Sequence, residues 1–282
     1  MTIRTAIVVE GGAMRGVFSA GVLDALLELG LSDFDLAIGT SAGACNLASF
    51  IARQHGRNLR CYVNIMARRQ LFSVRRALRG GHYMDLDWLW DAFSSEDPLD
   101  EAAVAAARTE LVSVATCAAT GDPVYFTASG ATIHHDLKAG CALPFLYRGP
   151  VAIQDKHVVD GGLVDPIPAQ EAYRRGARRI IVIRSRPSGV VKRSNALTRP
   201  LAALLSRTPA VAKASLHTAQ RYQEAVQFIK APPPDAQIIE LAPVQPLKTK
   251  RTTQDPECLR ADYATGHALT HRSRERLHAL LS

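Results

Sequence analysis

Ser41 stands between Gly39 and Gly43 in the pentapeptide GTSAG. The apolar run over residues 35–38 predicts a short buried strand before it, and residues 44–53 predict a helix after it. Gly-x-Ser-x-Gly between a strand and a helix is the nucleophile-elbow pattern, in which a sharp turn exposes the serine hydroxyl at the end of the strand. Glycines flank such a turn because larger side chains would clash with the strand and the helix. Ser41 is therefore a candidate nucleophile.

A second glycine-rich stretch, EGGAMRG, covers residues 10–16 between a predicted strand and a predicted helix. Its small residues allow backbone N–H groups to converge on an anion. One interpretation is a dinucleotide-binding turn, but Ala13 occupies the place of the middle glycine in Gly-x-Gly-x-x-Gly. The other is an oxyanion hole formed by N–H groups near Gly12 and Ala13. The serine pentapeptide favours the oxyanion hole, because neighbouring parallel strands end at one edge of a sheet.

The third motif is Asp160-Gly161-Gly162, at the end of a hairpin predicted over residues 151–159. A carboxylate held within ~3 Å of a serine hydroxyl can accept its proton directly. Glycine loop, serine turn and aspartate turn, each at a strand end, form a coherent set for acyl transfer. Gly39, Gly43, Gly161 and Gly162 are expected to allow the tight backbone turns of the serine and aspartate motifs.

The histidines and cysteines do not follow a metal-binding or triad pattern. A Ser-Asp-His triad needs a histidine on a strand-end loop after Asp160. The histidines that follow it are in predicted helices, and we interpret all nine histidines as structural or surface residues. The five cysteines are odd in number and lack paired spacing, which favours free thiols in a reducing compartment over a disulfide framework or a zinc site. We expect neither a metal nor a cofactor.

The net charge of +8 suits an anionic partner, although it can also serve solubility alone. No helix-turn-helix, zinc-finger or RNA-binding signature accompanies the basic clusters, which disfavours a nucleic-acid partner. No apolar run approaches the ~20 residues of a membrane helix, and the apolar stretch at the N-terminus is too short for a signal peptide. The expectation is a cytoplasmic protein that contacts the anionic inner membrane surface peripherally, in an oligomeric state that the sequence leaves open.

Other stretches predict the surroundings of the three motifs. Residues 57–78 predict a helix that is basic on one side, and residues 259–281 predict a basic C-terminal helix. Residues 83–93 hold both tryptophans and are either core packing or an apolar lip over a lipid site. We expect a single domain over residues 1–282, with a motif-bearing core over about 5–185 and a C-terminal extension of helices and a strand over about 195–282.

The three motifs in this order resemble the patatin-like phospholipases, in particular the small bacterial members. The small-residue stretch over residues 139–145 is also similar to the family's stretch before its aspartate. The resemblance implies a three-layer α/β/α fold with a central, mostly parallel sheet. It also implies hydrolysis of lipid esters by a Ser–Asp dyad, with Ser41 as nucleophile and Asp160 as general base. The implied oxyanion hole is the backbone around Gly11, Gly12 and Ala13, with Arg15 nearby.

Two positions depart from the family pattern. Glu10 stands where the family commonly has glycine or aspartate, and Ala13 stands where plant members carry glycine. Alanine still offers its N–H group, so the oxyanion hole is retained. A carboxylate at Glu10 would weaken anion stabilisation if it faced the site. An alternative is therefore a catalytically weak or inactive member that binds lipid or regulates. A nucleotide-binding protein is a third alternative, which leaves the serine and aspartate motifs unexplained.

Overall fold

The computed structural model describes residues 4–144, 146–147, 149–188 and 208–282. Its centre is an eight-stranded sheet in the order β5-β6-β3-β2-β1-β7-β8, with β4 paired to β3. β3, β2, β1, β7 and β8 are mutually parallel, while β4 and β6 pair antiparallel with β3. The strands are β1 (Arg4–Val9), β2 (Leu36–Thr40), β3 (Glu110–Cys117), β4 (Pro123–Thr127), β5 (Val151–Ile153), β6 (Lys156–Asp160), β7 (Ala177–Ile183) and β8 (Gln237–Leu241).

The central strands are apolar on both faces because helices cover both. Residues 6–9 of β1, 36–38 of β2 and 180–183 of β7 have no exposed surface. Parallel strands covered on two sides are typically continuous apolar runs of this kind. Because β1 and β2 pair in parallel, Val9 opposite Gly39, the glycine loop and the serine turn leave the sheet side by side. The expectation that both loops lie at one sheet edge is confirmed.

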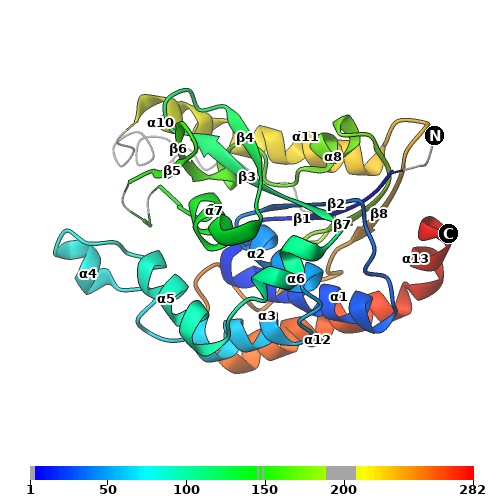
Figure 1. Ribbon diagram of the computed structural model, residues 1–282, viewed down its shortest axis with the longest axis horizontal. Coiled ribbons are helices and arrows are strands. Elements are labelled where there is room, and N and C mark those ends of the chain that lie inside the picture. The colour runs from blue at the N-terminus through cyan, green and yellow to red at the C-terminus, as the bar shows by residue number, and fades with distance from the viewer. Residues whose placement is uncertain (1–3, 145, 148, 189–207) are drawn as a thin grey trace.

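Helices pack on both sides of the sheet (Figure 1). α8 and α11 cover one face, and α1, α2, α3 and α12 cover the other. The predicted three-layer α/β/α architecture is confirmed. The helices are α1 (Gly16–Glu28), α2 (Ala42–Ile51), α3 (Arg57–Arg60), α4 (Val74–Leu78), α5 (Leu86–Glu96), α6 (Glu101–Ala106), α7 (Ile133–Gly140), α8 (Ala169–Arg174), α10 (Pro209–Leu216), α11 (Thr218–Lys230), α12 (Pro256–Arg272) and α13 (Arg274–Leu281). None of the helices in the described ranges is long and apolar enough to cross a membrane.

The single helix predicted over residues 57–78 is wrong. The chain forms α3, a π-helical turn over Cys61–Met66, and then the separate short helix α4. The side chain of Ser73 caps α4 by accepting a hydrogen bond from the N–H of Arg76. The guanidinium of Arg76 donates to the carbonyls of Gln70, Leu71, His82 and Tyr83, which holds the turn closed. These local hydrogen bonds of Ser73 and Arg76 therefore interrupt the helix that the pattern of residues 57–78 predicts.

The helix predicted over residues 259–281 is interrupted once. α12 ends at Arg272. The N–H of the next residue, Ser273, donates to the carbonyls of Leu269 and Thr270, and α13 continues from Arg274. The expected start of the C-terminal extension, near residue 195, lies outside the described residues.

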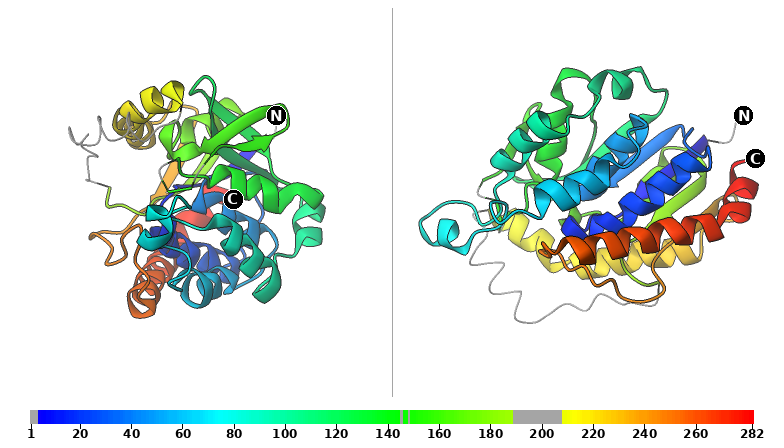
Figure 2. Two further views of the ribbon diagram at one scale, coloured as in Figure 1. Left: turned by 90° about the vertical axis from the view of Figure 1, so that its left-hand side faces the viewer. Right: turned by 90° about the horizontal axis from the view of Figure 1, so that it is seen from below.

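α1 and α12 lie side by side along their lengths (Figures 1 and 2). Two glycines allow this close approach. A Cβ atom on Gly21 of α1 would lie 2.0 Å from the carbonyl oxygen of Tyr263, and one on Gly266 of α12 would lie 2.2 Å from that of Phe18. α1 is buried along residues 16–26 because the sheet covers one side and α12 the other. The C-terminal segment is thus an integral part of one outer layer.

Replacing Gly21 by alanine should therefore destabilise the protein although alanine favours helices. Overpacking against a backbone carbonyl forces the helices apart, and we expect a loss of at least about 2 kcal/mol in the free energy of unfolding. Urea unfolding measures this loss of stability. Thr265→Ala is the control, because Thr265 is exposed on α12, the helix that Gly21 contacts. Equal stability of Gly21→Ala and the wild type would contradict this close helix contact.

Candidate active site

Ser41 occupies the sharp turn between β2 and α2. Its backbone has φ 54° and ψ −128°, which is strained for a residue with a side chain. A Cβ on Gly39 would lie 2.5 Å from the amide nitrogen of Ala44, and one on Gly43 would lie 2.4 Å from the carbonyl oxygen of Val9. Both positions therefore require glycine. Ser41 is also the N-cap residue of α2, so the positive end of the helix dipole lies beside its hydroxyl.

Asp160 ends β6, two strands away from β2. β3 lies between them, with Ala115 opposite Asp160 and Val114 opposite Thr40. The segment after Asp160 returns to the serine turn, because the hydroxyl of Thr40 donates a 2.8 Å hydrogen bond to the carbonyl of Asp165. This packing needs Gly161, where a Cβ would lie 2.3 Å from the carbonyl oxygen of Val114. The aspartate turn is thereby fixed against the residue that precedes Ser41.

The Asp160 side chain is almost completely buried, with 2% of its surface exposed. One carboxylate oxygen accepts a 2.7 Å hydrogen bond from the N–H of Gly162. Ser41 and Asp160 both line a cavity of about 620 Å³, together with Gly11, Gly12, Ala13 and Arg15. The structure therefore brings the residues predicted for the dyad and for the oxyanion hole around one space.

The glycine loop offers two N–H groups to this cavity. The N–H of Gly11 donates to the carbonyl of Pro166 at 3.3 Å and is thus already engaged. The N–H groups of Gly12 and Ala13 have no hydrogen-bond acceptor among the residues that the structure describes. Ala13 has a positive φ of 49° and is the first residue of a 3-10 turn over Ala13–Arg15. Gly12 and Ala13 thus line the cavity with backbone donors that no described residue engages.

Glu10 is buried beside this loop, and its carboxylate has its own partners. The N–H and the hydroxyl of Ser185 donate to it at 2.7 and 3.2 Å, and the Arg186 guanidinium lies 3.8 Å away. Arg15, Arg186 and Arg251 also line the cavity. Burial is the main cause that lowers the pKa of Arg15 to about 10; Glu10 opposes this shift, and Arg186 and Arg251 add to it. The polar side of the cavity therefore holds three guanidiniums beside the carboxylates of Glu10 and Asp160.

Two thiols lie next to the serine. The sulfur atoms of Cys45 and Cys141 are 3.6 Å apart, and the Cys141 thiol interacts with the Ser41 hydroxyl. The Cys45 contact, burial and the nearby Asp160 charge raise the pKa of Cys141 well above its usual value. Cys141 is therefore a neutral thiol that packs against Ser41.

A second, apolar cavity of about 850 Å³ shares Ser41 with the first. Its walls are mostly hydrophobic and include Met14, Leu71, Met84, Trp90 and Phe93. Trp90 belongs to the core and also lines this cavity, so the two interpretations of the aromatic stretch meet in one residue. Ser41 thus lies between a cavity lined by charged side chains and an apolar cavity.

Sequence reasoning missed Arg186, Arg251 and Cys141 as residues around the serine. Arg251 belongs to a segment that carries no recognisable motif, whereas Cys141 belongs to the small-residue stretch over residues 139–145, which did not indicate that its thiol would contact Ser41. The basic clusters that contain the two arginines were a signal for an anionic partner, but they gave no position.

The chain is similar to known proteins over most of its length. A family model described as "Patatin-like phospholipase" matches residues 7–173, and one described as "Domain of unknown function (DUF6363)" matches residues 208–282. The chain is 36% identical over 268 residues to the uncharacterized protein YjjU of Escherichia coli (strain K12), covering 93% of this chain and 75% of YjjU. It also resembles the crystal structure of VipD from Legionella pneumophila, with a TM-score of 0.47 and 12% identity over 98% of this chain and 67% of that one.

Asp165 makes the stability of this region depend on pH. Burial raises the pKa of its carboxyl group to about 6, against the opposing effect of a 2.7 Å hydrogen bond from the Tyr125 hydroxyl. A raised carboxyl pKa means that stability falls as pH rises from about 4 to about 6, where the buried group must ionise. Asp165→Asn should therefore stabilise the protein more at pH 7.5 than at pH 4, by on the order of 2 kcal/mol.

Urea unfolding of Asp165→Asn and wild type at both pH values gives this difference. Asp122→Asn, an exposed carboxyl on the β3–β4 turn, is the control and should show no such change. The same effect of Asp165→Asn at both pH values would contradict the assigned burial.

Proposed function

The chain belongs to the patatin-like phospholipase family, a family of lipid acyl hydrolases, and on that premise we propose that it hydrolyses lipid esters with a Ser41–Asp160 dyad. The observation that carries the proposal is that a strained serine at the N-terminus of a helix and a buried aspartate line the same cavity. Strain of this kind persists only where the surrounding structure enforces it, and it is common at reacting residues.

In the proposed mechanism Ser41 attacks the ester carbonyl while its proton passes to Asp160. The negative charge that develops on the carbonyl oxygen is stabilised by the N–H groups of Gly12 and Ala13 and by the N-terminal end of α2. Collapse of this intermediate releases the alcohol, which takes the proton from Asp160, and leaves an acyl-enzyme. Asp160 then accepts a proton from water, which attacks the acyl group. The bond to Ser41 breaks, the Ser41 oxygen takes the proton from Asp160, and the fatty acid is released.

The surroundings of Glu10 favour this enzyme over the inactive alternative. A free carboxylate at the oxyanion hole would repel the developing charge. Here two donors from Ser185 and the nearby guanidinium of Arg186 engage the Glu10 carboxylate. These partners thus largely balance the charge of Glu10, which lines the same cavity as Gly12 and Ala13.

The two cavities suggest the kind of ester. The apolar cavity begins at Ser41, and its mostly hydrophobic walls suit an acyl chain. On the other side of Ser41 three guanidiniums, those of Arg15, Arg186 and Arg251, would attract a phosphate. We therefore favour esters with a long acyl chain and an anionic headgroup over short or neutral esters.

The segment over residues 69–84, here called the α4 tip, is the part of the surface best suited to a membrane. It projects from the body of the molecule (Figure 1). Val74 and Leu78 are exposed on it by 62% and 84%, and the exposed Arg75 and Arg79 lie among them. Exposed apolar side chains beside arginines favour the interface of an anionic bilayer. The tip adjoins the apolar cavity, whose walls include Leu71, Phe72 and Met84 from the tip.

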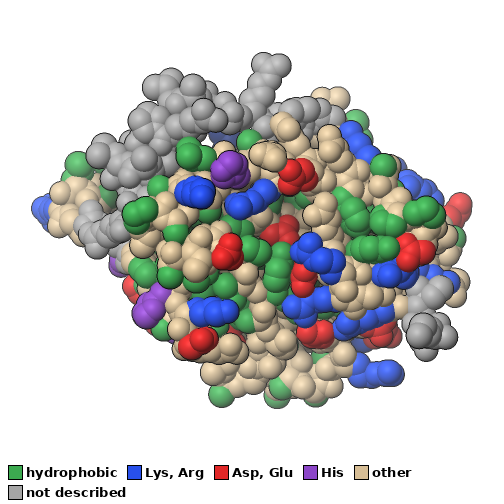
Figure 3. Space-filling model, turned by 90° about the horizontal axis from the view of Figure 1, so that it is seen from above, with side chains coloured by type: hydrophobic (Ala, Val, Ile, Leu, Met, Phe, Trp, Pro, Cys, Tyr) green, Lys and Arg blue, Asp and Glu red, His purple; other side chains and the backbone are tan. Residues whose placement is uncertain are grey.

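The face that carries α8 and α11 is less suited to such contact. It shows acidic side chains interspersed with basic ones (Figure 3). Several are paired there, including Arg175 with Glu110 and Arg178 with Asp235. The excess positive charge is therefore not gathered into one patch on that face, and we propose that peripheral membrane contact is made by the α4 tip.

The dyad is tested by steady-state hydrolysis of a long-chain phospholipid ester. Ser41→Ala and Asp160→Asn should each lower kcat by about 1,000-fold or more, because they remove the nucleophile and its base. Ser95→Ala and Asp91→Asn, both exposed on α5, are matched controls that should retain the wild-type rate. Unchanged hydrolysis in Ser41→Ala would contradict the proposal, and a folded wild type that binds but never cleaves lipid would favour the inactive alternative.

The α4 tip is tested by sedimentation with vesicles of anionic phosphatidylglycerol and of neutral phosphatidylcholine. We expect binding to the anionic vesicles only, and at least a 10-fold loss of binding in Val74→Ser/Leu78→Ser, because the exposed apolar anchors are removed. Leu216→Ser/Val244→Ser removes two other exposed apolar side chains and should bind as the wild type does. Equal binding to both vesicle types at low salt would contradict the electrostatic attraction.

A further inference from the structure

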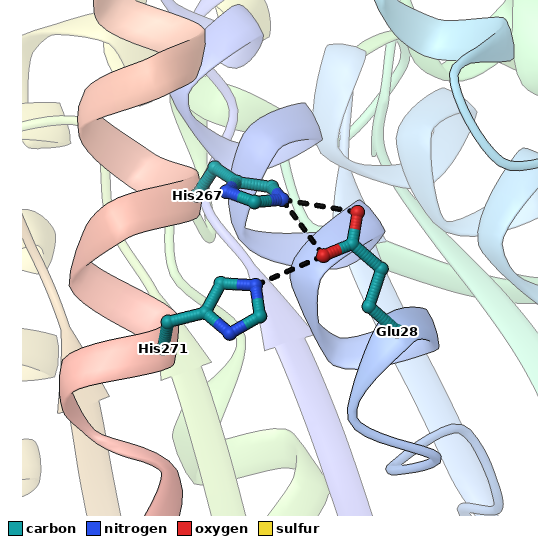
Figure 4. A group of neighbouring side chains, drawn as sticks. All are labelled: Glu28, His267 and His271. Atoms are coloured by element: carbon teal, nitrogen blue, oxygen red, sulfur yellow. Dashed lines mark hydrogen bonds and ion pairs between the residues drawn. The ribbon is translucent and has the colours of Figure 1, made fainter.

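Three side chains that the proposed function does not use converge on the outer surface of the α1–α12 pair (Figure 4). Glu28 is the last residue of α1, and His267 and His271 face it from α12. Nε2 of His267 lies 3.0 and 2.9 Å from the two carboxylate oxygens, and Nε2 of His271 lies 2.9 Å from one of them. One nitrogen of each imidazole and one carboxylate oxygen all lie within 4.8 Å of one another.

The scaffold that holds these side chains is rigid. His267 and His271 are four residues apart, so they project from the same side of α12 on successive turns. The glycine contacts at Gly21 and Gly266 fix the distance between the two helices. Asp24 lies one turn before Glu28 on α1, and Tyr263 lies one turn before His267 on α12. The hydroxyl of Tyr263 donates a 2.7 Å hydrogen bond to the carboxylate of Asp24. The two helices are thus joined by pairs on successive turns, which orient the imidazoles toward the carboxylate.

We propose that Glu28, His267 and His271 bind a zinc ion. Two imidazoles and a carboxylate are a donor set that suits zinc, with bonds of about 2.0–2.2 Å and tetrahedral geometry. Ligand atoms in such a tetrahedron are about 3.4 Å apart. The nitrogen–oxygen distances of 2.9–3.0 Å are close to this value, so small side-chain movements open the space for the ion. Hard cations such as magnesium prefer oxygen donors and should bind weakly.

A third histidine supports the carboxylate from the other side. Nε2 of His55, in the loop after α2, lies 2.9 Å from Oε1 of Glu28. In the zinc-bound form its N–H would donate to the carboxylate oxygen that does not hold the ion, as outer partners of metal ligands commonly do. Water completes the coordination, because the side chains of Glu28, His267 and His271 are 36%, 31% and 38% exposed and the site is open to solvent.

The position of the site indicates a structural role. α1 begins at Gly16, next to the glycine loop of the active site, and Glu28 is 12 residues further along, about 18 Å away. The ion would therefore take no part in ester hydrolysis. It would bridge the segment matched by the patatin model to the C-terminal segment matched by the second family model. Zinc bound to the folded state alone stabilises that state by mass action.

The test uses the full chain, stripped of metal with a chelator, and measures zinc uptake by equilibrium dialysis and the melting temperature with zinc chloride. We expect about one zinc per chain and a rise in melting temperature of roughly 5 °C at about 100 times the dissociation constant. Glu28→Gln and His267→Ala/His271→Ala should each lose at least 100-fold in zinc affinity and lose the thermal shift. His217→Ala/His278→Ala removes two exposed histidines elsewhere and should bind zinc as the wild type does.

Circular dichroism establishes that each variant is folded, and Glu28→Gln keeps the shape of the side chain if the double variant does not fold. A folded wild type that takes up no zinc would overturn the proposal. Equal zinc uptake by the wild type and Glu28→Gln would also overturn it, because the ion would then lie elsewhere. Hydrolysis of lipid esters is a separate readout and should be the same with and without zinc.

Discussion

The backbone of Ser41 is held in a conformation that the chain maintains only through close packing on every side. β2 must end, turn and continue as α2 within one residue, while the loop after β1 passes close enough for Gly43 to touch the carbonyl of Val9. The same closeness recurs at Gly161, which lies on the carbonyl of Val114. Each contact leaves no room for a Cβ atom. The site is therefore an assembly of backbone segments at one sheet edge, and its side chains are few.

This dependence explains why so much of the site was predictable from the sequence. Glycines at positions 39, 43, 161 and 162 mark local turns, and a turn of this kind after an apolar run fixes where the neighbouring side chain emerges. Because β1 and β2 are parallel neighbours, two of the three turns were expected at one edge, and the structure has them there. The three-layer fold follows from the same alternation of buried strands and helices.

The features that could not be predicted depend on packing between segments that are far apart in the sequence, and no local pattern indicates such contacts. Nothing local in the stretch around Arg251 indicates that its side chain lines the cavity of Ser41. The break before α4 arises from one guanidinium that caps several carbonyls at once, whereas the helical pattern of residues 57–78 is continuous. His267 and His271 have a spacing that fits one side of a helix, but Glu28 is far away in sequence. Only the α1–α12 contact brings the three together.

The most direct test of the account is covalent labelling with a fluorophosphonate, followed by intact mass and peptide mapping. The reagent reports a serine that is activated by a base and faced by oxyanion donors, whatever lipid the enzyme prefers. We predict one adduct per chain on the peptide that contains Ser41, none in Ser41→Ala, and strongly slowed labelling in Asp160→Asn. An adduct that forms in Ser41→Ala at the wild-type rate, or no adduct on folded wild type, would contradict the central claim that this turn holds an activated nucleophile.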